Sequence, residues 1–158
     1  MTKRIMALDV GERRIGVAIT DPLGLTAQPL EVIERRGDRA AVARIIEIAD
    51  SYQVGEIVVG IPYGARGQLT QQAQRIARFA DLVAARAPAP VVRHDERHTT
   101  VTAERVLLEA DASRAKRRLA RDKMAAAVLL QDYLQARSRR AQDPPGASES
   151  RANGDDKT

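Results

Sequence analysis

The sequence predicts an α/β protein built around one mixed five-stranded sheet. Three short apolar runs open the chain, at residues 5–10, 15–20 and 27–33, and their close succession indicates an antiparallel meander. Two more apolar runs, at residues 56–61 and 91–94, alternate with stretches of helical periodicity, which is the pattern of βα units. The expected element order is βββαβαβα followed by a C-terminal helix.

The helices are expected between and after the later strands. Asp38 is the expected N-cap of the first helix, whose apolar residues recur at i, i+3, i+4 and i+7. A second helix is predicted over residues 70–87, and a third begins at Thr99 or Thr100. The last helix is predicted over residues 114–137.

Length and composition favour one folded domain with a polar tail. The chain has 158 residues, and residues 1–137 are assigned to the domain. Residues 138–158 are rich in Pro, Gly, Ser, Asn and charge without apolar periodicity, which predicts a disordered tail. The chain lacks Cys, which fits a cytoplasmic protein, and no apolar run approaches the roughly 20 residues that cross a membrane.

The charge balance predicts a polyanionic partner. The chain carries 26 Lys and Arg against 21 Asp and Glu, a net charge of +5, and its pI is near 10.1. Nucleic acid is the commonest partner of such a protein, and Arg suits bidentate contacts with phosphate. With one Phe, three Tyr and no Trp, a platform for base stacking is not expected.

Asp9 is an anomaly in the first predicted strand. A carboxylate inside a buried strand costs free energy unless it is paired, protonated or bound to a cation. Gly11, two residues later, leaves space for a group to approach the backbone. The alternative is that Asp9 caps the turn through its side chain.

Further acidic residues follow the last predicted strand. In mixed sheets the functional crevice lies at the carboxyl ends of parallel strands, so these residues are expected near Asp9 if their strands are adjacent. Asp95 and Glu96 point to opposite sides, so only one of them faces the crevice. Alternatively both are solvated loop residues, and one of them pairs with Arg97.

Asp122 is expected on the apolar face of the last helix. Leu119, Ala126, Leu129 and Tyr133 stand at helical spacing from it, whereas its sequence neighbours are basic. A carboxylate on that face is expected either to join a functional site or to form a buried salt bridge with Arg or Lys.

Taken together, Asp9, Glu96 and Asp122 predict a metal site. Three converging carboxylates repel one another unless cations lie among them, and all-oxygen ligands suit Mg²⁺ or Mn²⁺. Two such ions can activate a water molecule and stabilise the leaving oxygen in phosphodiester hydrolysis. The set therefore predicts a metal-dependent nuclease.

Basic residues near these acids are candidates for contacts with the phosphate backbone. Residues 114–123 hold six Lys or Arg in ten positions. Arg13 and Arg14 lie in the first turn, where solvated residues would look the same. The complete set of candidates is Arg13, Arg14, Arg66, Arg97, Arg114, Lys116, Arg117, Arg118, Arg121 and Lys123.

Four motifs, in this order, resemble the YqgF (RuvX) family of bacterial proteins over roughly residues 4–136. They are Leu8-Asp9-Val10-Gly11 with Ile15-Gly16-Val17-Ala18, Val58-Val59-Gly60-Ile61-Pro62, Asp95-Glu96-Arg97-His98-Thr99-Thr100, and Lys123-Met124-Ala125-Ala126-Ala127.

The resemblance implies a ribonuclease H-like fold with Asp9, Glu96 and Asp122 as the acidic residues. It also implies a cytoplasmic nuclease that finishes the 5′ end of pre-16S ribosomal RNA, with Holliday-junction resolution as the related activity. The loop Gly64-Ala65-Arg66-Gly67 departs from the acidic loop usual in the family, which affects substrate contacts and not the metal ligands.

Two other functions fit parts of this pattern. Asp-x-Gly before a meander also opens sugar-kinase and actin-like folds, but those proteins need two such domains and this chain has room for one. The other alternative is a non-enzymatic RNA-binding factor in ribosome assembly. The partners expected for the nuclease are ribosomal RNA precursor, structured RNA or branched DNA, together with the ribosome. A two-fold junction would also favour a homodimer.

Overall fold

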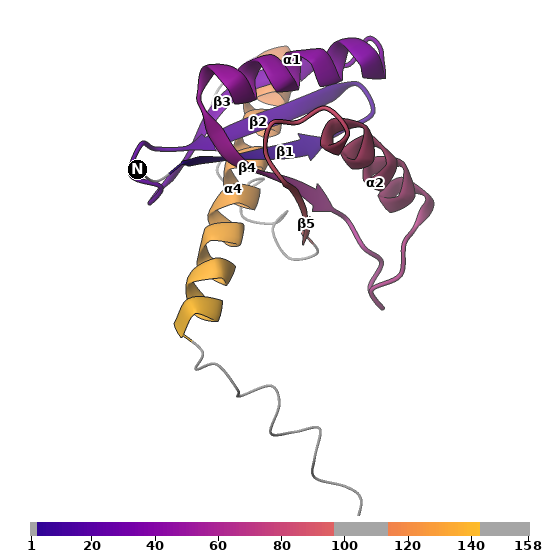
Figure 1. The fold of residues 1–158 in the computed structure, drawn as a ribbon. Coiled ribbons are helices and arrows are strands. Elements are labelled where there is room, and N and C mark those ends of the chain that lie inside the picture. Colours follow the sequence, from indigo (N-terminus) through magenta and orange to yellow (C-terminus); the bar gives the residue numbers. More distant parts are fainter. Residues whose placement is uncertain (1–2, 97–113, 143–158) are drawn as a thin grey trace, which may run out of the picture.

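The computed structural model describes residues 3–96 and 114–142 (Figure 1). Its strands are β1 (Arg4–Val10), β2 (Arg14–Thr20), β3 (Ala27–Glu34), β4 (Val54–Ile61) and β5 (Val91–Asp95). Its helices are α1 (Asp38–Ser51), α2 (Gln71–Ala84) and α4 (Arg114–Gln142). The predicted helix that begins at Thr99 or Thr100 lies outside the described residues, as do Arg97 and His98.

The strands form one mixed sheet in the order β3-β2-β1-β4-β5. Strands β1, β2 and β3 pair antiparallel, as the predicted meander requires, whereas β1, β4 and β5 run parallel. The carboxyl ends of these three parallel strands therefore meet at one edge. This arrangement confirms the predicted five-stranded sheet, and it brings the ends of β1 and β5 to the same edge.

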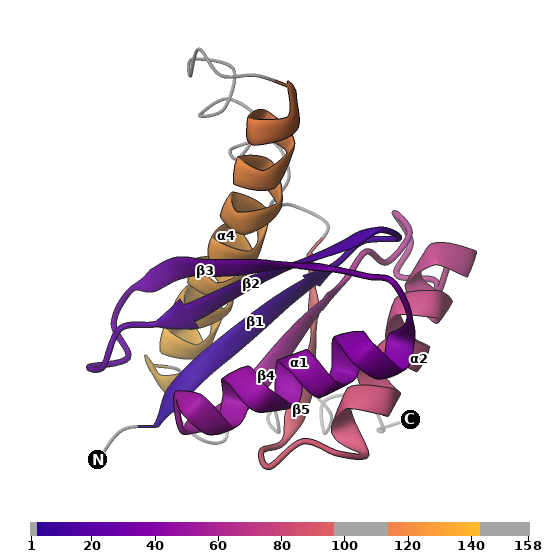
Figure 2. The same cartoon turned by 90° about the horizontal axis from the view of Figure 1, so that it is seen from above.

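The two faces of the sheet carry different layers. Helices α1 and α2 pack on one face, and α4 crosses the other (Figure 2). The core under α1 and α2 contains Leu8, Val10 and Ile61, whereas Ala7 and Val58 pack under α4. Because strand residues alternate between faces, this pattern places the odd-numbered residues of β1 and the even-numbered residues of β4 under α4.

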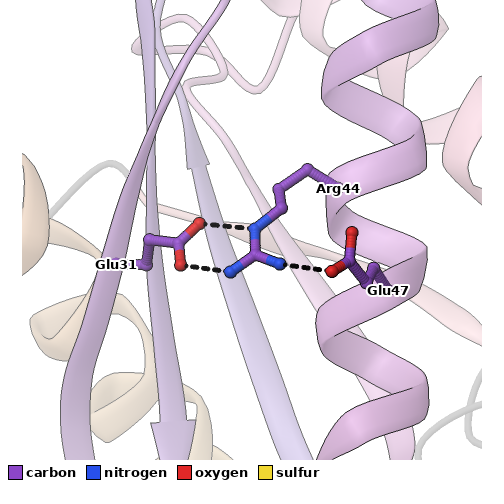
Figure 3. Close-up of polar contacts among 3 residues, drawn as sticks. All are labelled: Glu31, Arg44 and Glu47. Carbon is purple, nitrogen blue, oxygen red and sulfur yellow. Dashed lines mark hydrogen bonds and ion pairs between the residues drawn. The ribbon is translucent and has the colours of Figure 1, made fainter.

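An ion-pair cluster fastens the edge strand β3 to α1 (Figure 3). Arg44 donates two hydrogen bonds to the carboxylate of Glu31, of 2.9 and 2.6 Å, and pairs with Glu47 at 2.9 Å. The hydrogen bonds from Arg44 hold the pKa of Glu31 below its usual value. The bidentate geometry fixes the position of α1 relative to the strand.

Several predicted helix boundaries need correction. Gly37, not Asp38, occupies the N-cap of α1, and the Asp38 carboxylate pairs instead with Arg35 at 3.0 Å. Helix α2 is capped by Thr70, whose hydroxyl accepts a hydrogen bond from the Ala73 N–H, and it ends three residues before the predicted boundary at 87.

The last helix continues beyond its predicted end at residue 137. Helix α4 runs to Gln142, so the first five residues of the predicted tail are helical. The remainder of that predicted tail, residues 143–158, lies outside the described residues. None of the described helices is both long enough and apolar enough to span a bilayer.

Candidate active site

The carboxyl edge of the parallel strands brings two of the predicted acids together. Asp9 is the penultimate residue of β1, and Glu96 directly follows β5. The Glu96 N–H donates a hydrogen bond of 3.2 Å to the Ile61 carbonyl, which extends the pairing of β5 with β4 by one residue. Asp9 is not needed to cap the hairpin turn, because the Gly11 N–H closes it by donating to the Arg14 carbonyl at 2.9 Å.

Glu96 is the acid that faces Asp9 under α4. A methyl group built on Gly60 would lie 2.4 Å from a Glu96 carboxylate oxygen and 2.9 Å from Leu129 of α4. Gly60 therefore leaves the space that the Glu96 carboxylate occupies. Asp95 pairs with Ile61, a residue of the opposite core, and so belongs to the face covered by α2.

Gly16 places Asp122 beside Asp9. Gly16 is the cross-strand partner of Asp9 in β2. A methyl group on Gly16 would lie 2.0 Å from the backbone carbonyl oxygen of Asp122, so only glycine lets α4 approach the sheet this closely. The helix therefore brings a third carboxylate to the same edge, as the periodicity predicts.

Electrostatics set this edge apart from the rest of the molecule. Burial, together with the charge of Asp122, raises the pKa of Asp9 from 3.8 to about 6. Burial, with the charges of Asp9 and Asp95, raises the pKa of Glu96 from 4.5 to about 7. Buried carboxyl groups that repel one another in this way are typical of sites that bind cations or transfer protons.

The third carboxylate also has a cationic partner. The Arg14 Nε donates to Asp122 Oδ2 at 2.7 Å, and the two side chains are 25% and 26% exposed. The sequence allowed Asp122 either a functional site or a buried salt bridge. The structure shows a salt bridge, which is only partly buried. Leu119, predicted on the buried face with Asp122, is 44% exposed, because α4 leaves the sheet at its N-terminal end.

The oxygen atoms of these carboxylates are suitable ligands for a hard divalent cation, but the three side chains do not converge on one point. Among residues 3–96 and 114–142, no three His, Asp or Glu side chains form a group that could hold a metal ion. Asp9 and Glu96 meet at the edge, whereas Asp122 is engaged by Arg14. All three supply oxygen, which is the donor that Mg²⁺ and Mn²⁺ prefer.

The basic candidates gather at the exposed start of α4. Arg114, Arg117, Arg118 and Arg121 stand at i, i+3, i+4 and i+7, and they line a pocket of about 290 Å³. Residues 114–121 are all exposed, and in Figure 2 this end of α4 projects beyond the sheet. We call these four residues the arginine stripe. It adjoins Asp122 directly in the sequence.

The remaining basic candidates are distributed differently. Arg13 is exposed in the hairpin turn, and Arg66 is exposed in the loop after β4. Lys116 and Lys123 are also exposed on α4, whereas Arg14 is bonded to Asp122.

A second polar cluster near the edge was not assigned from the sequence. His94 Nε2 lies 2.7 Å from an Asp132 carboxylate oxygen, and its ring meets the Tyr133 ring edge-on at 5.4 Å between centroids. The Tyr133 hydroxyl donates to Glu56 of β4. The cluster joins α4 to β4 and β5, and it requires contacts between segments remote in the sequence, which periodicity alone does not reveal.

The mixed sheet, its flanking helices and the carboxylates at the parallel edge define a ribonuclease H-like protein. The sequence profile of the RuvX family, described as Holliday junction resolvase, matches residues 3–136. The chain therefore belongs to the RuvX family, and the resemblance seen in the motifs is confirmed.

Curated relatives match along nearly their whole length. A protein of Symbiobacterium thermophilum named "Putative pre-16S rRNA nuclease" is 53% identical over 137 residues, covering 87% of this chain and 95% of the relative. A protein of the same name from Pelotomaculum thermopropionicum is 46% identical over 144 residues, covering 90% and 94%.

Solved structures support the fold independently. The RuvC protein of T. thermophilus in complex with a Holliday junction substrate aligns with a TM-score of 0.53 and 18% identity, covering 87% of this chain and 96% of that one. The fowlpox virus Holliday junction resolvase aligns with a TM-score of 0.52 and 14% identity, covering 84% and 99%. At these identities the likeness shows the fold, which confirms the predicted fold class.

Proposed function

We propose that this protein is a divalent-metal-dependent nuclease that hydrolyses phosphodiester bonds in ribosomal RNA precursor, with cleavage of four-way DNA junctions as the related activity. The observation that carries the proposal is the half-buried pair Asp9 and Glu96 at the parallel edge, with Asp122 and the arginine stripe next to it. Such a role would place the protein in the cytoplasm with the ribosome as a partner.

Asp9, Glu96 and Asp122 are the residues that would hold the cation. A bound Mg²⁺ or Mn²⁺ supplies charge stabilisation at a phosphoryl oxygen and lowers the pKa of a bound water. The protein's own contribution is to bring carboxylates of the required kind together at low solvent exposure. Both raised pKa values support this assignment, because a cation relieves the repulsion that the folded chain otherwise imposes.

The arginine stripe would position the nucleic acid backbone. Residues seven positions apart on a helix are separated by about 10 Å along its axis, enough to follow successive phosphates of one strand. Arg13, Arg66, Lys116 and Lys123 would add charge for the same backbone.

Cleavage of matched substrates by the full chain tests the proposal. A pre-16S ribosomal RNA fragment, a DNA of the same sequence and a four-way DNA junction are incubated with Mg²⁺, with Mn²⁺ and with chelator. We expect metal-dependent cleavage by the parent and loss of roughly 10²-fold or more in Asp9→Asn and Glu96→Gln, the scale reached when one group that stabilises the transition state is removed.

The same experiment separates the nuclease from a ribosome-assembly factor. Binding of the RNA without cleavage under every metal condition would indicate the non-enzymatic alternative. The expected homodimer on a two-fold junction is checked by sedimentation of the protein with and without the four-way junction. A single copy bound to the junction would contradict that part of the proposal.

A further inference from the structure

Arg14 occupies an unusual position for a residue of a hairpin. It opens β2, immediately after the turn, and by alternation its side chain shares the face of Gly16, which is the face under α4. Its Nε reaches Asp122 Oδ2 at 2.7 Å, a contact between residues 108 positions apart. The two side chains are about three-quarters buried, so this ion pair is more than a contact between solvated surface groups.

The pair lies within a strongly acidic surrounding. Asp122 repels Asp9, and Asp9 in turn repels Glu96. The guanidinium of Arg14 contacts this set through Asp122. The positive charge of the guanidinium therefore neutralises the same carboxylate that a divalent cation would bind.

We propose that Arg14 is a positioning residue that holds Asp122 in the metal-free protein and competes with the divalent cation for its carboxylate. This inference rests on the proposed function, because it takes Asp122 as a ligand. Arg14 Nε donates to Asp122 Oδ2. A cation bound through this oxygen would take the place of that donor, so we expect metal binding to break the Arg14–Asp122 pair. The protein thus exchanges one cationic partner of Asp122 for another, and Arg14 becomes available at the mouth of the site.

The exchange predicts an effect opposite to that of losing a ligand. A variant without Arg14 leaves Asp122 free for the cation, so it binds metal more tightly, although the metal-free fold loses an ion pair. A pair of this exposure corresponds to a change of about fivefold in the dissociation constant. Arg13 provides a matched control, because it directly precedes Arg14, carries the same charge and is exposed.

The test is a calorimetric titration of the full chain with Mn²⁺ and with Mg²⁺, at a pH well above the pKa values of Asp9 and Glu96. The parent, Arg14→Ala, Arg14→Lys and Arg13→Ala are compared, and the melting temperature of each is measured in chelator. Arg14→Ala is expected to bind about fivefold more tightly, with Arg14→Lys between it and the parent and Arg13→Ala near the parent.

A spectroscopic readout follows the pair directly. In a ¹⁵N-labelled protein, the Nε–H signal that is missing from Arg14→Ala identifies Arg14. Addition of diamagnetic Mg²⁺ should move this signal toward the positions of exposed arginines, because the bond to Asp122 is broken.

The outcomes separate this inference from the proposed function. Equal metal affinity in the parent and Arg14→Ala, weaker binding by Arg14→Ala, or equal tightening in Arg13→Ala would overturn the competition while leaving the metal site in place. An Arg14 signal that stays fixed while metal binds would do the same. Absence of metal binding in the parent and in Arg14→Ala would overturn the metal site itself, and the competition with it.

Discussion

The two faces of the sheet are built from the same strands, but one holds the larger apolar core and the other holds the acidic residues. On the face under α1 and α2, the strands present large aliphatic side chains such as Met6, Leu8 and Ile15, all fully buried. On the face under α4, the corresponding positions hold small or acidic residues, among them Ala7, Asp9 and the cross-strand Gly16. Apolar burial is therefore concentrated on one face, whereas the other gives up side-chain volume to admit a helix and three carboxylates.

This contrast shows how a small domain accommodates a costly site. Carboxylates that repel one another at low exposure destabilise the fold, and the core under α4 is the smaller of the two cores. The opposite face supplies the required burial through helices that carry no candidate catalytic residue. Changes on the two faces should therefore have separable effects on stability and on cleavage.

The largest expected effect on stability lies on the α1 and α2 face. Phe79 of α2 is 1% exposed, and Phe79→Ala should reduce the free energy of unfolding by about 3–5 kcal/mol. Leu82→Ala, in the same helix but 47% exposed, should cost less than about 1 kcal/mol. Denaturant unfolding measures both. Cleavage per folded molecule should be unchanged in both variants, and a specific loss in Phe79→Ala would contradict the division between the faces.

The α4 face should make stability depend on pH in a distinctive direction. Asp9 and Glu96 have folded-state pKa values raised to about 6 and about 7, so the folded protein favours their protonated forms. Their stabilising contribution is complete below about pH 4 and is lost as the pH rises through 6 to 7, by roughly 3 kcal/mol for each group taken alone.

The measurement is the free energy of unfolding in chelator as a function of pH, for the parent and for Asp9→Asn. Subtracting the two curves removes the contribution of groups such as Glu31, whose lowered pKa acts in the opposite direction at lower pH. The parent should lose stability relative to Asp9→Asn between about pH 4 and 7. A difference that is flat, or that rises with pH, would show that Asp9 is not buried and repelled as described.

Gly60 should link packing on the α4 face to catalysis. In Gly60→Ala, the new methyl group would meet the Glu96 carboxylate at 2.4 Å and Leu129 at 2.9 Å. The displaced carboxylate should lower cleavage by about 10²-fold, with a stability loss of roughly 1–2 kcal/mol. Gly37→Ala is the control, since nothing lies within 4 Å of the added methyl group. Normal cleavage by Gly60→Ala would remove Glu96 from the site.

Much of the fold was predictable from local pattern. Apolar runs identified the five strands. If β1, β4 and β5 lay parallel in neighbouring positions, their ends would share one edge, which made Asp9, Asp95 and Glu96 the candidates there. The alternation of strand residues left Asp95 and Glu96 as alternatives, because the choice between them depends on which face each helix covers. Only the assembled sheet, with Gly60 beneath the carboxylate, resolves that choice.

The contacts that were missed join remote segments or depend on cooperativity. The Arg14–Asp122 pair requires α4 to lie across β2, and the sequence marks that approach only by Gly16, one of several glycines near strands. The end of α4 was placed too early because apolar periodicity stops after Leu134. Residues of good helix propensity, Arg, Ala and Gln, continue the helix to Gln142, and residues 138–141 are exposed.

The arginine stripe should affect binding more than stability. Replacing Arg117 and Arg118 with Ala should weaken RNA and DNA similarly and reduce the slope of log K against log salt by up to about 2, since each lost phosphate contact removes about one released counterion. Arg139 and Arg140, exposed in the last turn of the same helix, provide a control pair of equal charge. Fluorescence anisotropy at several salt concentrations measures the slopes. Equal changes in both pairs would mean that binding follows net charge and not the stripe.

The smallest expected effect on stability comes from shortening the C-terminus. Successive truncations show where the part of α4 that packs on the sheet ends. Truncation after Gln142 removes residues without any large apolar side chain, so the melting temperature should change by less than about 2 °C. Truncation after Arg137 also removes the last five helical residues, of which residues 138–141 are exposed, and should cost little more. Truncation after Asp132 removes Tyr133, with its buried ring and its bond to Glu56, and should lower the melting temperature by several degrees. A large drop already at the first cut would show that residues beyond Gln142 pack on the domain and that the α4 face extends further than the core of this helix indicates.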